Sequence, residues 1–344
     1  MATESVRNVA AVLHAPGDLR IEERPMPTPG PGEVLVQVGS VGICGSDVHY
    51  YEHGRIGDYV VHSPMVLGHE AGGVVVDRGA GATALAVGQR VAVEPGIPCS
   101  RCEQCRRGAY NLCPNVRFFA TPPIDGALTR YVTVHEAFAH PVPDSLSDDA
   151  AALIEPLSVG IWANRRSATG IGSRVLVTGA GPIGVLAALT ARAAGAGWVG
   201  LADVHPARLK AAEGFDVQDV IDARDGVDYA TYRPDVLLEC SGAPSVVTAG
   251  IKALQPLGRA VLIGMGPTPE QSLPVQTIQN RELCVTGTFR YAHTYPDAIA
   301  LVAAGRIDLD ELVGARLPLA ESERALTMGR TDPSVLKTVV TVQE

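Results

Sequence analysis

The stretch RVLVTGAGPIGVLAALTARAAGAGWVGLAD, residues 174–203, decides the fold of the second half of this 344-residue chain. It begins with a β-branched run that predicts a strand, and the motif G-x-G-x-x-G follows at Gly179, Gly181 and Gly184. An apolar helix-like segment comes next, and a second strand ends at Asp203, 19 residues after Gly184. This order predicts a dinucleotide-binding fold, in which the glycines let the backbone approach a pyrophosphate at the helix N-terminus.

The acidic end of the second strand indicates which dinucleotide is bound. Asp203 would accept hydrogen bonds from the adenosine ribose hydroxyls, and its charge would repel a 2′-phosphate, so NAD is favoured over NADP. Arg208 would attract a phosphate, but beside Asp203 we interpret it as a contact near the adenine or as an ordinary helix-surface charge.

Strands continue to alternate with helix-like segments after this motif. Further strands are predicted at 235–240, 259–264 and 282–289. The alternation predicts an α/β domain, a Rossmann doubly wound parallel sheet with helices on both faces. Cys240 and Cys284 fall within these strands and are predicted to be core residues.

The first half of the chain has a different pattern of short strands and turns. Strands are predicted at 9–14, 20–23, 33–38, 71–79 and 89–95. Their close spacing suggests a compact β-barrel, and the 37 glycines and 25 prolines of the chain fit many turns. A chain of this length exceeds the usual size of a single core, so two domains are expected.

Residues 41–70, VGICGSDVHYYEHGRIGDYVVHSPMVLGHE, bring metal-ligating side chains into this barrel. Cys44, His69 and Glu70 offer sulfur, nitrogen and oxygen, a mixture that zinc accepts, and three protein ligands leave a position open for water or substrate. Glycines on both sides of the cysteine and before the histidine allow tight turns around an ion. Taken alone, a cysteine and a histidine at this separation are more often a buried thiol and a core histidine.

Four further cysteines form the strongest local signal in the sequence. Their spacing is C-x2-C-x2-C-x7-C, at Cys99, Cys102, Cys105 and Cys113. Four thiolates complete a tetrahedral zinc, so the spacing predicts a structural site. An iron–sulfur cluster also takes four thiolates, whereas a nucleic-acid zinc module would need a recognition helix and a basic surface that are not indicated here.

A helix is predicted to start near residue 147, where Ser147 or Asp148 can cap its first turn. Glu155 lies in its apolar stretch. A carboxylate there is usually solvent-facing or salt-bridged, and a neighbouring metal site would also explain it.

The composition of the chain indicates which classes of binding partner to expect. The net charge of −9 without a block of Lys or Arg argues against a nucleic-acid partner, so a small molecule is the better hypothesis. The first 20 residues have no apolar signal region, and no run is long enough to span a bilayer. With seven cysteines, four of them bunched, we expect a cytoplasmic protein without a membrane partner.

Together these segments resemble the zinc-dependent medium-chain dehydrogenases, and among them the sorbitol, xylitol and L-arabinitol dehydrogenases. The resemblance runs from about residue 9 to 340 and rests on specific motifs. These are GICGSDVHYYEHGRIGD (42–58), VLGHE (66–70), YNLCP (110–114), FFATPP (118–123), DGAL (125–128), LIEPLSVG (153–160) and TFRY (288–291).

The resemblance implies an architecture and a reaction. It implies a GroES-like β-barrel catalytic domain at 1–155 with a zinc lobe at 96–115, an NAD-binding domain at 156–288, and a return to the catalytic domain at 289–344. It implies NAD-linked, reversible oxidation of a polyol to its ketose by a homotetramer. Alternatives are a zinc dehydrogenase for threonine or butanediol and a non-catalytic NAD-binding protein.

The resemblance also implies a role for each matching residue. Cys44, His69 and Glu70 are zinc ligands, and Glu155 reaches the metal through a bound water, although which glutamate binds directly stays open. Asp47 orients the histidine, and Ser46 with His49 passes the proton outward. Tyr50, Phe118, Thr121, Glu155, Arg290 and Tyr291 form the substrate pocket. The cofactor is held by Gly179, Gly181, Ile183, Gly184, Asp203, Arg208, Ile263, Gly264, Met265, Thr288, Phe289 and Arg290.

Overall fold

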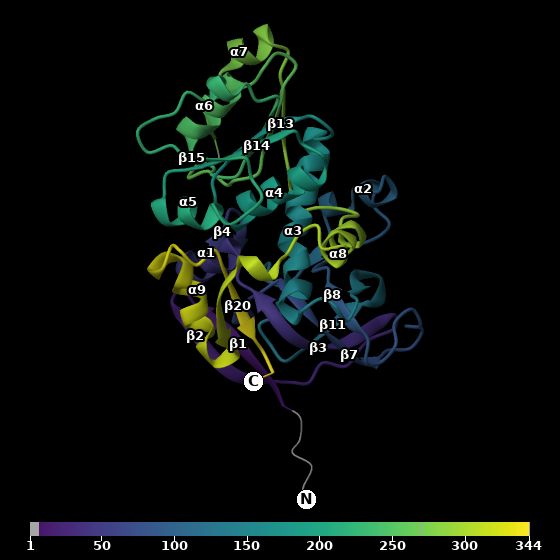
Figure 1. The fold of residues 1–344 in the computed structure, drawn as a ribbon. Helices are drawn as coiled ribbons and strands as arrows, with labels where there is room; N and C mark the ends of the chain where they lie inside the picture. The colour runs from purple at the N-terminus through teal and green to yellow at the C-terminus, as the bar shows by residue number, and fades with distance from the viewer. Residues whose placement is uncertain (1–6, 269, 344) are drawn as a thin grey trace, which may run out of the picture. The chain divides into compact units, whose positions relative to one another are not determined.

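The computed structural model describes residues 7–268 and 270–343, which divide into two compact units (Figure 1). The described part of unit 1 covers 7–155 and 295–343, and unit 2 covers Pro156–Thr294. In this division the chain returns to the first unit at Tyr295.

Unit 1 is built mainly on antiparallel β-structure, with β19 and β20 paired in parallel. Its largest sheet has the order β12-β8-β7-β3-β20-β19, with β11 also paired to β3, and a smaller sheet has the order β2-β1-β6. The main strands are β1 (Asn8–Ala15), β2 (Asp18–Arg24), β3 (Glu33–Gly42), β6 (Met65–Val66), β7 (Glu70–Arg78), β8 (Arg90–Val93), β11 (Tyr131–His135), β12 (Ala139–Pro141), β19 (Val313–Pro318) and β20 (Lys337–Thr341). The five strands expected in this half all form.

Shorter elements of unit 1 connect these strands. They are β4 (Arg55–Ile56), β5 (Tyr59–Val60), β9 (Gly96–Ile97), β10 (Arg117–Phe118), α1 (Gly45–His53), α2 (Glu103–Arg106), η1 (Tyr110–Leu112), η2 (Glu136–Phe138), α8 (Tyr295–Ala303), η4 (Asp310–Leu312), η5 (Leu319–Glu321) and α9 (Ser322–Thr331).

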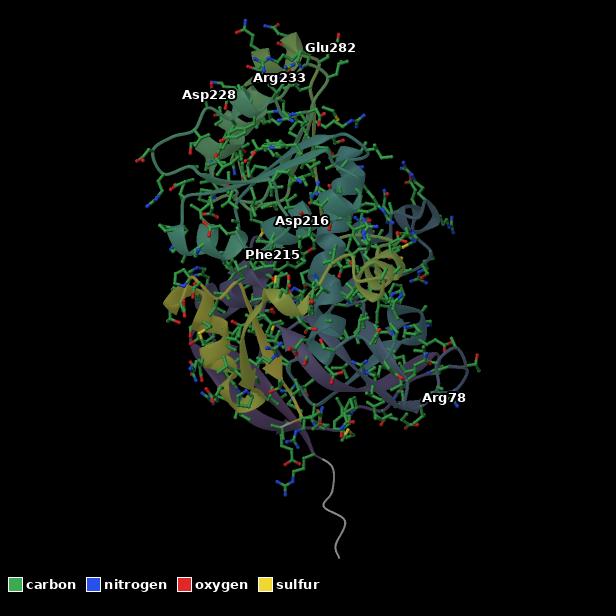
Figure 2. The ribbon with its side chains drawn as sticks, in the orientation of Figure 1. Arg78, Phe215, Asp216, Asp228, Arg233 and Glu282 are labelled. Carbon is green, nitrogen blue, oxygen red and sulfur yellow. The ribbon has the colours of Figure 1, made fainter. Side chains whose placement is uncertain are left out.

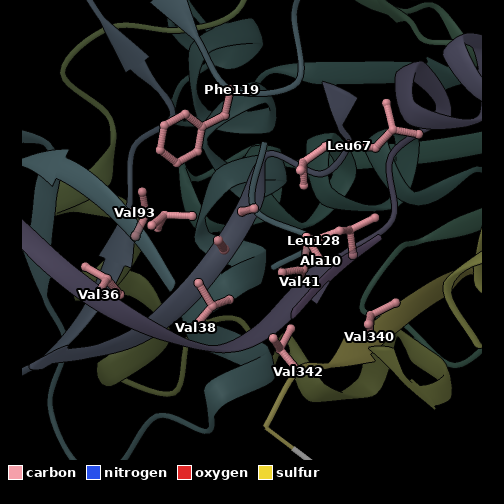
Figure 3. Close-up of a cluster of buried hydrophobic side chains, with 14 of the residues drawn as sticks. Ala10, Val36, Val38, Val41, Leu67, Val93, Phe119, Leu128, Val340 and Val342 are labelled. Carbon is pink, nitrogen blue, oxygen red and sulfur yellow. The ribbon is translucent and has the colours of Figure 1, made fainter. Parts of the chain in front are cut away.

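The core of unit 1 lies on the inner face of its strands (Figure 3). In β3 the side chains of Val34, Val36, Val38 and Val41 are fully buried, and they meet Val340 of β20 within the same cluster. Each such side chain contributes about 1.5–3 kcal/mol by leaving water. The last strand of the chain is thereby held against one of the first.

Unit 2 is a parallel six-stranded sheet with the order β15-β14-β13-β16-β17-β18. Its strands are β13 (Arg174–Thr178), β14 (Trp198–Asp203), β15 (Asp219–Asp222), β16 (Val236–Glu239), β17 (Arg259–Leu262) and β18 (Cys284–Gly287). Its other elements are α4 (Pro182–Ala193), α5 (Pro206–Ala212), η3 (Tyr229–Tyr232), α6 (Pro244–Ala253) and α7 (Val275–Asn280). Figure 1 shows α4 and α5 on one side of the sheet and α6 on the other, so the predicted doubly wound fold is confirmed.

The crossover before β16 ends in a tight turn. Asp228 caps η3 by accepting a hydrogen bond from the Ala230 N–H at 3.1 Å, and Arg233 closes it with φ +51° (Figure 2). The chain then enters β16, where Leu237 and Leu238 are fully buried, as expected of a central parallel strand.

The prediction that Cys284 is a core residue is wrong. Cys284 opens β18, which is the edge strand of the sheet, and its side chain is exposed. Cys240 lies just beyond the end of β16 and is partly buried. A strand pattern in the sequence does not reveal which strand is at the edge, and this explains the error.

Helix α3 (Asp148–Ser167) is the 20-residue segment that carries Glu155. The Ser147 hydroxyl caps it by accepting a hydrogen bond from the Ala150 N–H at 2.9 Å. Pro156 lies inside the helix and has no N–H to donate to the carbonyl one turn earlier, so one helical hydrogen bond is missing next to Glu155. Among the described residues, no helix has both the length and the apolarity needed to cross a membrane.

The close pairing of β3 with β7 generates a testable prediction. A Cβ added at Gly73 would lie 2.2 Å from the Gln37 carbonyl oxygen, so Gly73→Ala should lower the free energy of unfolding by about 1–3 kcal/mol. Gly329→Ala in α9 is the matched control, because nothing lies within 4 Å of its added Cβ. It should leave stability unchanged or raise it by up to about 1 kcal/mol. Denaturant melts of both variants test this, and equal stability of the two would contradict it.

Candidate functional site: a metal cluster and a dinucleotide fold

Cys44, His69 and Glu70 come together in unit 1. Their ligand atoms all lie within 4.8 Å of one another, and the histidine and glutamate are buried. Strand pairing produces this proximity, because Gly42 at the end of β3 pairs with Glu70 at the start of β7. The cysteine follows as the N-cap residue of α1. Two segments separated by more than twenty residues thus deliver a thiol, an imidazole and a carboxylate to one point.

Asp47 organises the two ligand loops. Its carboxylate, fully buried, accepts hydrogen bonds from the Cys44 N–H at 3.1 Å and the Gly68 N–H at 2.9 Å, and one of its oxygens lies 3.4 Å from His69 Nδ1. Nδ1 is therefore engaged by Asp47, which leaves Nε2 for a metal.

The contact between Asp47 and His69 shifts the pKa values of both side chains. Burial acts to raise the pKa of Asp47, but His69 and the two backbone N–H groups lower it below the ordinary value. Burial acts to lower the pKa of His69, whereas the charges of Asp47 and Cys44 raise it well above the ordinary value. The carboxylate is thus held in its charged form, in which it can orient the imidazole.

Glu70 has a partner that the sequence did not indicate. The Lys337 ammonium, at the start of β20, donates hydrogen bonds to Glu70 Oε1 at 2.7 Å and to the Ile43 carbonyl at 2.8 Å. It also lies 2.6 Å from Glu70 Oε2, so the ammonium contacts both oxygens of the carboxylate. A lysine before an apolar strand was the only signal in the sequence.

Because Gly42 has no side chain, it leaves room for the Glu70 carboxylate. A Cβ at this position would lie 2.1 Å from Glu70 Oε2.

Burial acts to lower the pKa of Lys337, yet the charges of Glu70, Cys44 and Glu155 raise it above its ordinary value. The lysine is therefore a permanent cation among these acidic groups.

The residues present fit a zinc ion. They supply sulfur, nitrogen and oxygen donors, which is a set that zinc binds, and these atoms lie within 4.8 Å of one another. Glu155 is buried but lies outside the group of atoms within 4.8 Å. Three side chains thus converge directly, and Glu155 acts on their surroundings through its charge on Lys337.

The other predicted residues of unit 1 take different environments. Ser46 is half-buried and His49 is exposed, both in α1. Tyr50 is buried in the core cluster. Phe118 lies beside the ligand histidine, with ring centroids of Phe118 and His69 5.8 Å apart, and Thr121 is half-buried just after it.

The four cysteines of the lobe also converge. The sulfur atoms of Cys99, Cys102, Cys105 and Cys113 lie within 4.8 Å of one another, and all four thiols are free of disulfides. Backbone N–H groups lower the pKa of Cys99 to about 6, and desolvation raises the pKa of Cys105 to about 12. Four sulfur donors with no other ligand type fit a closed structural zinc site.

In unit 2 the glycine motif has the geometry expected at a phosphate. Gly179 has φ +94°, and a Cβ at Gly184 would lie 1.7 Å from the Gly179 carbonyl oxygen. Helix α4 starts at Pro182, next to Ile183, without a side-chain cap, so N–H groups of its first turn can bind an anion. A Cβ at Gly181 would meet nothing within 4 Å.

Asp203 lies at the same edge of the sheet. Its carboxylate accepts hydrogen bonds from the N–H groups of Ala180, Val204 and His205 at 2.7, 2.7 and 2.8 Å, and Arg208 Nη1 lies 4.0 Å away. A carboxylate has about four acceptor positions, so one is left for a ribose hydroxyl. The structure thus joins the acidic residue to the glycine-rich turn.

The remaining predicted cofactor residues surround this edge in two loops. Ile263 and Gly264 donate backbone hydrogen bonds to the Glu239 carbonyl at 2.8 and 2.9 Å, and Met265 is exposed. In the second loop Thr288 is half-buried and Phe289 is exposed, with the Arg290 guanidinium 4.8 Å from its ring centroid. Tyr291, which follows, is buried.

Family comparisons agree with these two units. The family model described as "Alcohol dehydrogenase GroES-like domain" matches residues 30–144, and "Zinc-binding dehydrogenase" matches residues 182–304. The fold and the site thus define a two-domain, zinc-binding alcohol dehydrogenase.

Similar proteins identify the family more narrowly. The sorbitol dehydrogenase of Gallus gallus is 44% identical over 93% of this chain and 92% of its own length. Among solved structures, L-idonate 5-dehydrogenase from Escherichia coli has a TM-score of 0.91 at 30% identity and covers 98% of both chains. The 2R,3R-butanediol dehydrogenase from Bacillus subtilis has a TM-score of 0.88 at 30% identity and covers 97% of this chain and 99% of its own. The chain belongs to the sorbitol dehydrogenase family of zinc-dependent medium-chain dehydrogenases.

The position of Asp47 predicts the effect of removing its charge. Asp47→Asn should weaken zinc binding at the Cys44 cluster by about 10–100-fold, because the imidazole loses the carboxylate that orients it. Competition with a zinc chelator measures this. The exposed Asp58 provides the control, since Asp58→Asn should leave affinity unchanged. Unchanged affinity in Asp47→Asn would show that the carboxylate does not orient the ligand.

The thiol pKa values of the lobe predict that zinc binding releases protons. Near pH 7 the Cys105 thiol is protonated, so its coordination must displace a proton, and affinity should rise with pH. Calorimetry in buffers of different ionisation enthalpy counts the protons released. The Cys44→Ser variant isolates the lobe for this titration. Zinc affinity that stays constant between about pH 6 and 8 would contradict the expectation.

Proposed function

We propose that this protein catalyses the NAD-linked, zinc-dependent and reversible oxidation of a polyol, such as sorbitol or xylitol, to its ketose. The observation that carries the proposal is the cluster of Cys44, His69 and Glu70, whose ligand atoms lie within 4.8 Å of one another. The 44% identity to sorbitol dehydrogenase supports polyols as the substrate class.

Different residues of the protein would bind the metal and orient its ligands during the reaction. Zinc supplies Lewis acidity that lowers the pKa of a secondary hydroxyl, and NAD accepts the hydride from its carbon. Cys44, His69 and Glu70 would hold the metal while Asp47 fixes the imidazole. Glu155 would reach the centre less directly, in keeping with its position outside the 4.8 Å group.

A proton must leave when the hydroxyl is oxidised. Ser46 and His49 are proposed to pass it outward, and their burial supports this order, because Ser46 is half-buried and His49 exposed on the same helix. A hydroxyl can accept and donate in turn, and an imidazole exchanges protons with water near neutral pH.

Substrate recognition needs polar groups for several hydroxyls. We assign it to Tyr50, Phe118, Thr121, Glu155, Arg290 and Tyr291. Arg290 offers several donors and Tyr50 one donor and acceptor. The contact of Phe118 with the ligand histidine supports an apolar wall beside the metal.

NAD binding is assigned to unit 2. The pyrophosphate would be held by Gly179, Gly181, Ile183 and Gly184. The adenosine ribose would be bound by Asp203 together with Arg208. Ile263, Gly264, Met265, Thr288, Phe289 and Arg290 would hold the nicotinamide end. The exposed Met265 and Phe289 support this, since a cofactor would cover their apolar surface.

The organisation of the whole molecule is also a proposal. Residues 1–155 and 289–344 would form the catalytic domain, with the zinc lobe at 96–115, and 156–288 the NAD-binding domain. The family resemblance supports a homotetramer. The free cysteines support a cytoplasmic, reducing location.

Initial rates of NAD reduction test the function. Zinc-replete protein should oxidise sorbitol, xylitol, ribitol or L-arabinitol, lose this activity to a chelator, and use NAD in preference to NADP. The structural similarity to butanediol dehydrogenase makes 2,3-butanediol and L-threonine the informative controls. Turnover of these alone would refute the polyol assignment but keep the zinc mechanism. Absence of all turnover in protein that holds zinc and NAD would indicate a non-catalytic NAD-binding protein.

A further inference from the structure

Glu239 is a buried acid of unit 2 to which the proposed function gives no role. It is the last residue of β16, and its side chain is fully buried. Strands β13 and β16 pair in the sheet although they are not consecutive in the chain, so their carboxyl ends form the switch point of the sheet. Ligands of open α/β sheets bind beside this point. The carboxylate therefore lies where a cofactor is expected.

The Glu239 side chain holds the turn that follows its own strand. Oε1 accepts hydrogen bonds from the Ser241 N–H at 2.9 Å and from the Ser241 hydroxyl. Both oxygens accept from the Gly242 N–H, at 3.1 and 3.0 Å. Oε1 also accepts a hydrogen bond from the Thr178 hydroxyl at 3.2 Å. Because Thr178 directly precedes Gly179, one carboxylate joins the glycine-rich turn after β13 to the turn after β16.

The main chain of Glu239 reaches a third segment. Its carbonyl accepts hydrogen bonds from the Ile263 and Gly264 N–H groups at 2.8 and 2.9 Å. Glu239 is thus bonded to three segments at the same edge of the sheet, at Thr178, at 241–242 and at 263–264.

Glycines let these three segments approach one another closely. A Cβ at Gly179 would lie 3.0 Å from the Ser241 nitrogen. A Cβ at Gly264 would lie 2.4 Å from the Gly242 nitrogen, and one at Gly242 would lie 2.2 Å from the Met265 carbonyl oxygen. The segments are in contact without space for a side chain, so a shift of the turn at 241–242 must also move its neighbours.

The donors around Glu239 explain why this residue is an acid. A carboxylate has two oxygens that only accept hydrogen bonds, whereas a glutamine amide has one oxygen and one NH2 group. With glutamine, the NH2 group would face an N–H or hydroxyl donor of the surrounding segments. A buried donor that loses its acceptor is costly, so the turn would move to find another partner.

We propose that Glu239 is a positioning residue of the cofactor site: it holds the turn at 241–242, and thereby keeps the glycine-rich turn and the loop at 263–265 in the relative positions that a bound dinucleotide needs. This inference rests on the proposed function, which assigns the glycine-rich turn to the pyrophosphate and the loop to the nicotinamide end. It concerns residues of unit 2 alone.

Binding of NAD and of AMP to the zinc-replete protein tests this role. Glu239→Gln should weaken NAD binding about tenfold or more, because a donor replaces one acceptor oxygen. AMP lacks the nicotinamide half and contacts mainly the adenosine side at Asp203, so its affinity should fall clearly less. Titration calorimetry measures both affinities, and the melting temperature shows that the variant is folded.

Asp235→Asn is the matched control. Asp235 directly precedes the same strand at its other end, where its carboxylate accepts a hydrogen bond from the Arg174 N–H at 2.9 Å. The same change from carboxylate to amide at this end should leave the affinities for NAD and AMP unchanged. A purely structural Glu239 would behave like Asp235, with a changed melting temperature but an unchanged ratio of NAD to AMP affinity.

A folded Glu239→Gln variant that binds NAD as wild type does, or that loses the same factor for NAD and AMP, overturns the proposal. If this variant does not melt cooperatively, Thr178→Val decides, because it removes one donor to Glu239 and keeps a similar shape. Weaker NAD binding with unchanged AMP binding in Thr178→Val would support the proposal, and unchanged NAD binding would overturn it.

A wild-type protein that binds no NAD would refute the proposed function instead. Hydrogen exchange at the Ser241 and Gly242 amides would then still test Glu239. Faster exchange in Glu239→Gln than in wild type would show that the carboxylate holds the turn, and equal exchange would show that it does not.

Discussion

The antiparallel pairing of Gly42 with Glu70 is the constraint on which the rest of the candidate site depends. It sets the end of β3 against the start of β7. Cys44 lies two positions after Gly42, and His69 directly precedes Glu70, so the pairing brings both residues close together. Gly42 has no side chain, and this lets the Glu70 carboxylate occupy the space where a Cβ would lie. Asp47 then ties both loops together through the N–H groups of Cys44 and Gly68.

The two metal clusters illustrate two uses of the same donor chemistry. The lobe brings four sulfur atoms together within one short segment, which satisfies a zinc ion completely. The Cys44 cluster instead draws three different donors from two segments and adds a buried cation from the last strand. A mixed and incomplete ligand set suits a centre that must exchange substrate, whereas the all-sulfur set suits one that must not.

Much of this arrangement was predictable from local sequence. The glycine motif, the strand before it and Asp203 lie within one 30-residue unit, so their contact follows from the order of the elements. The lobe cysteines are also close in sequence. Cys44 and His69 were predictable as candidate ligands, and the structure brings their side chains together.

The rest depended on long-range pairing, which local patterns do not encode. Lys337 is 267 residues from Glu70, and their contact arises only because β20 pairs with β3. The exposure of Cys284 likewise depends on β18 being the edge of its sheet. The sequence also left open which glutamate would bind zinc directly, and in the structure Glu70, but not Glu155, lies in the cluster with Cys44 and His69.

The central claim is that two distinct metal centres exist in each chain, one of them formed by Cys44, His69 and Glu70. Anomalous X-ray scattering at the zinc edge, from crystals of the zinc-loaded protein, tests it most directly. The account predicts two anomalous peaks per chain, one among the four lobe cysteines and one in contact with Cys44, His69 and Glu70. A fully zinc-loaded chain with a peak only at the lobe, or with a second peak away from these three residues, would contradict it.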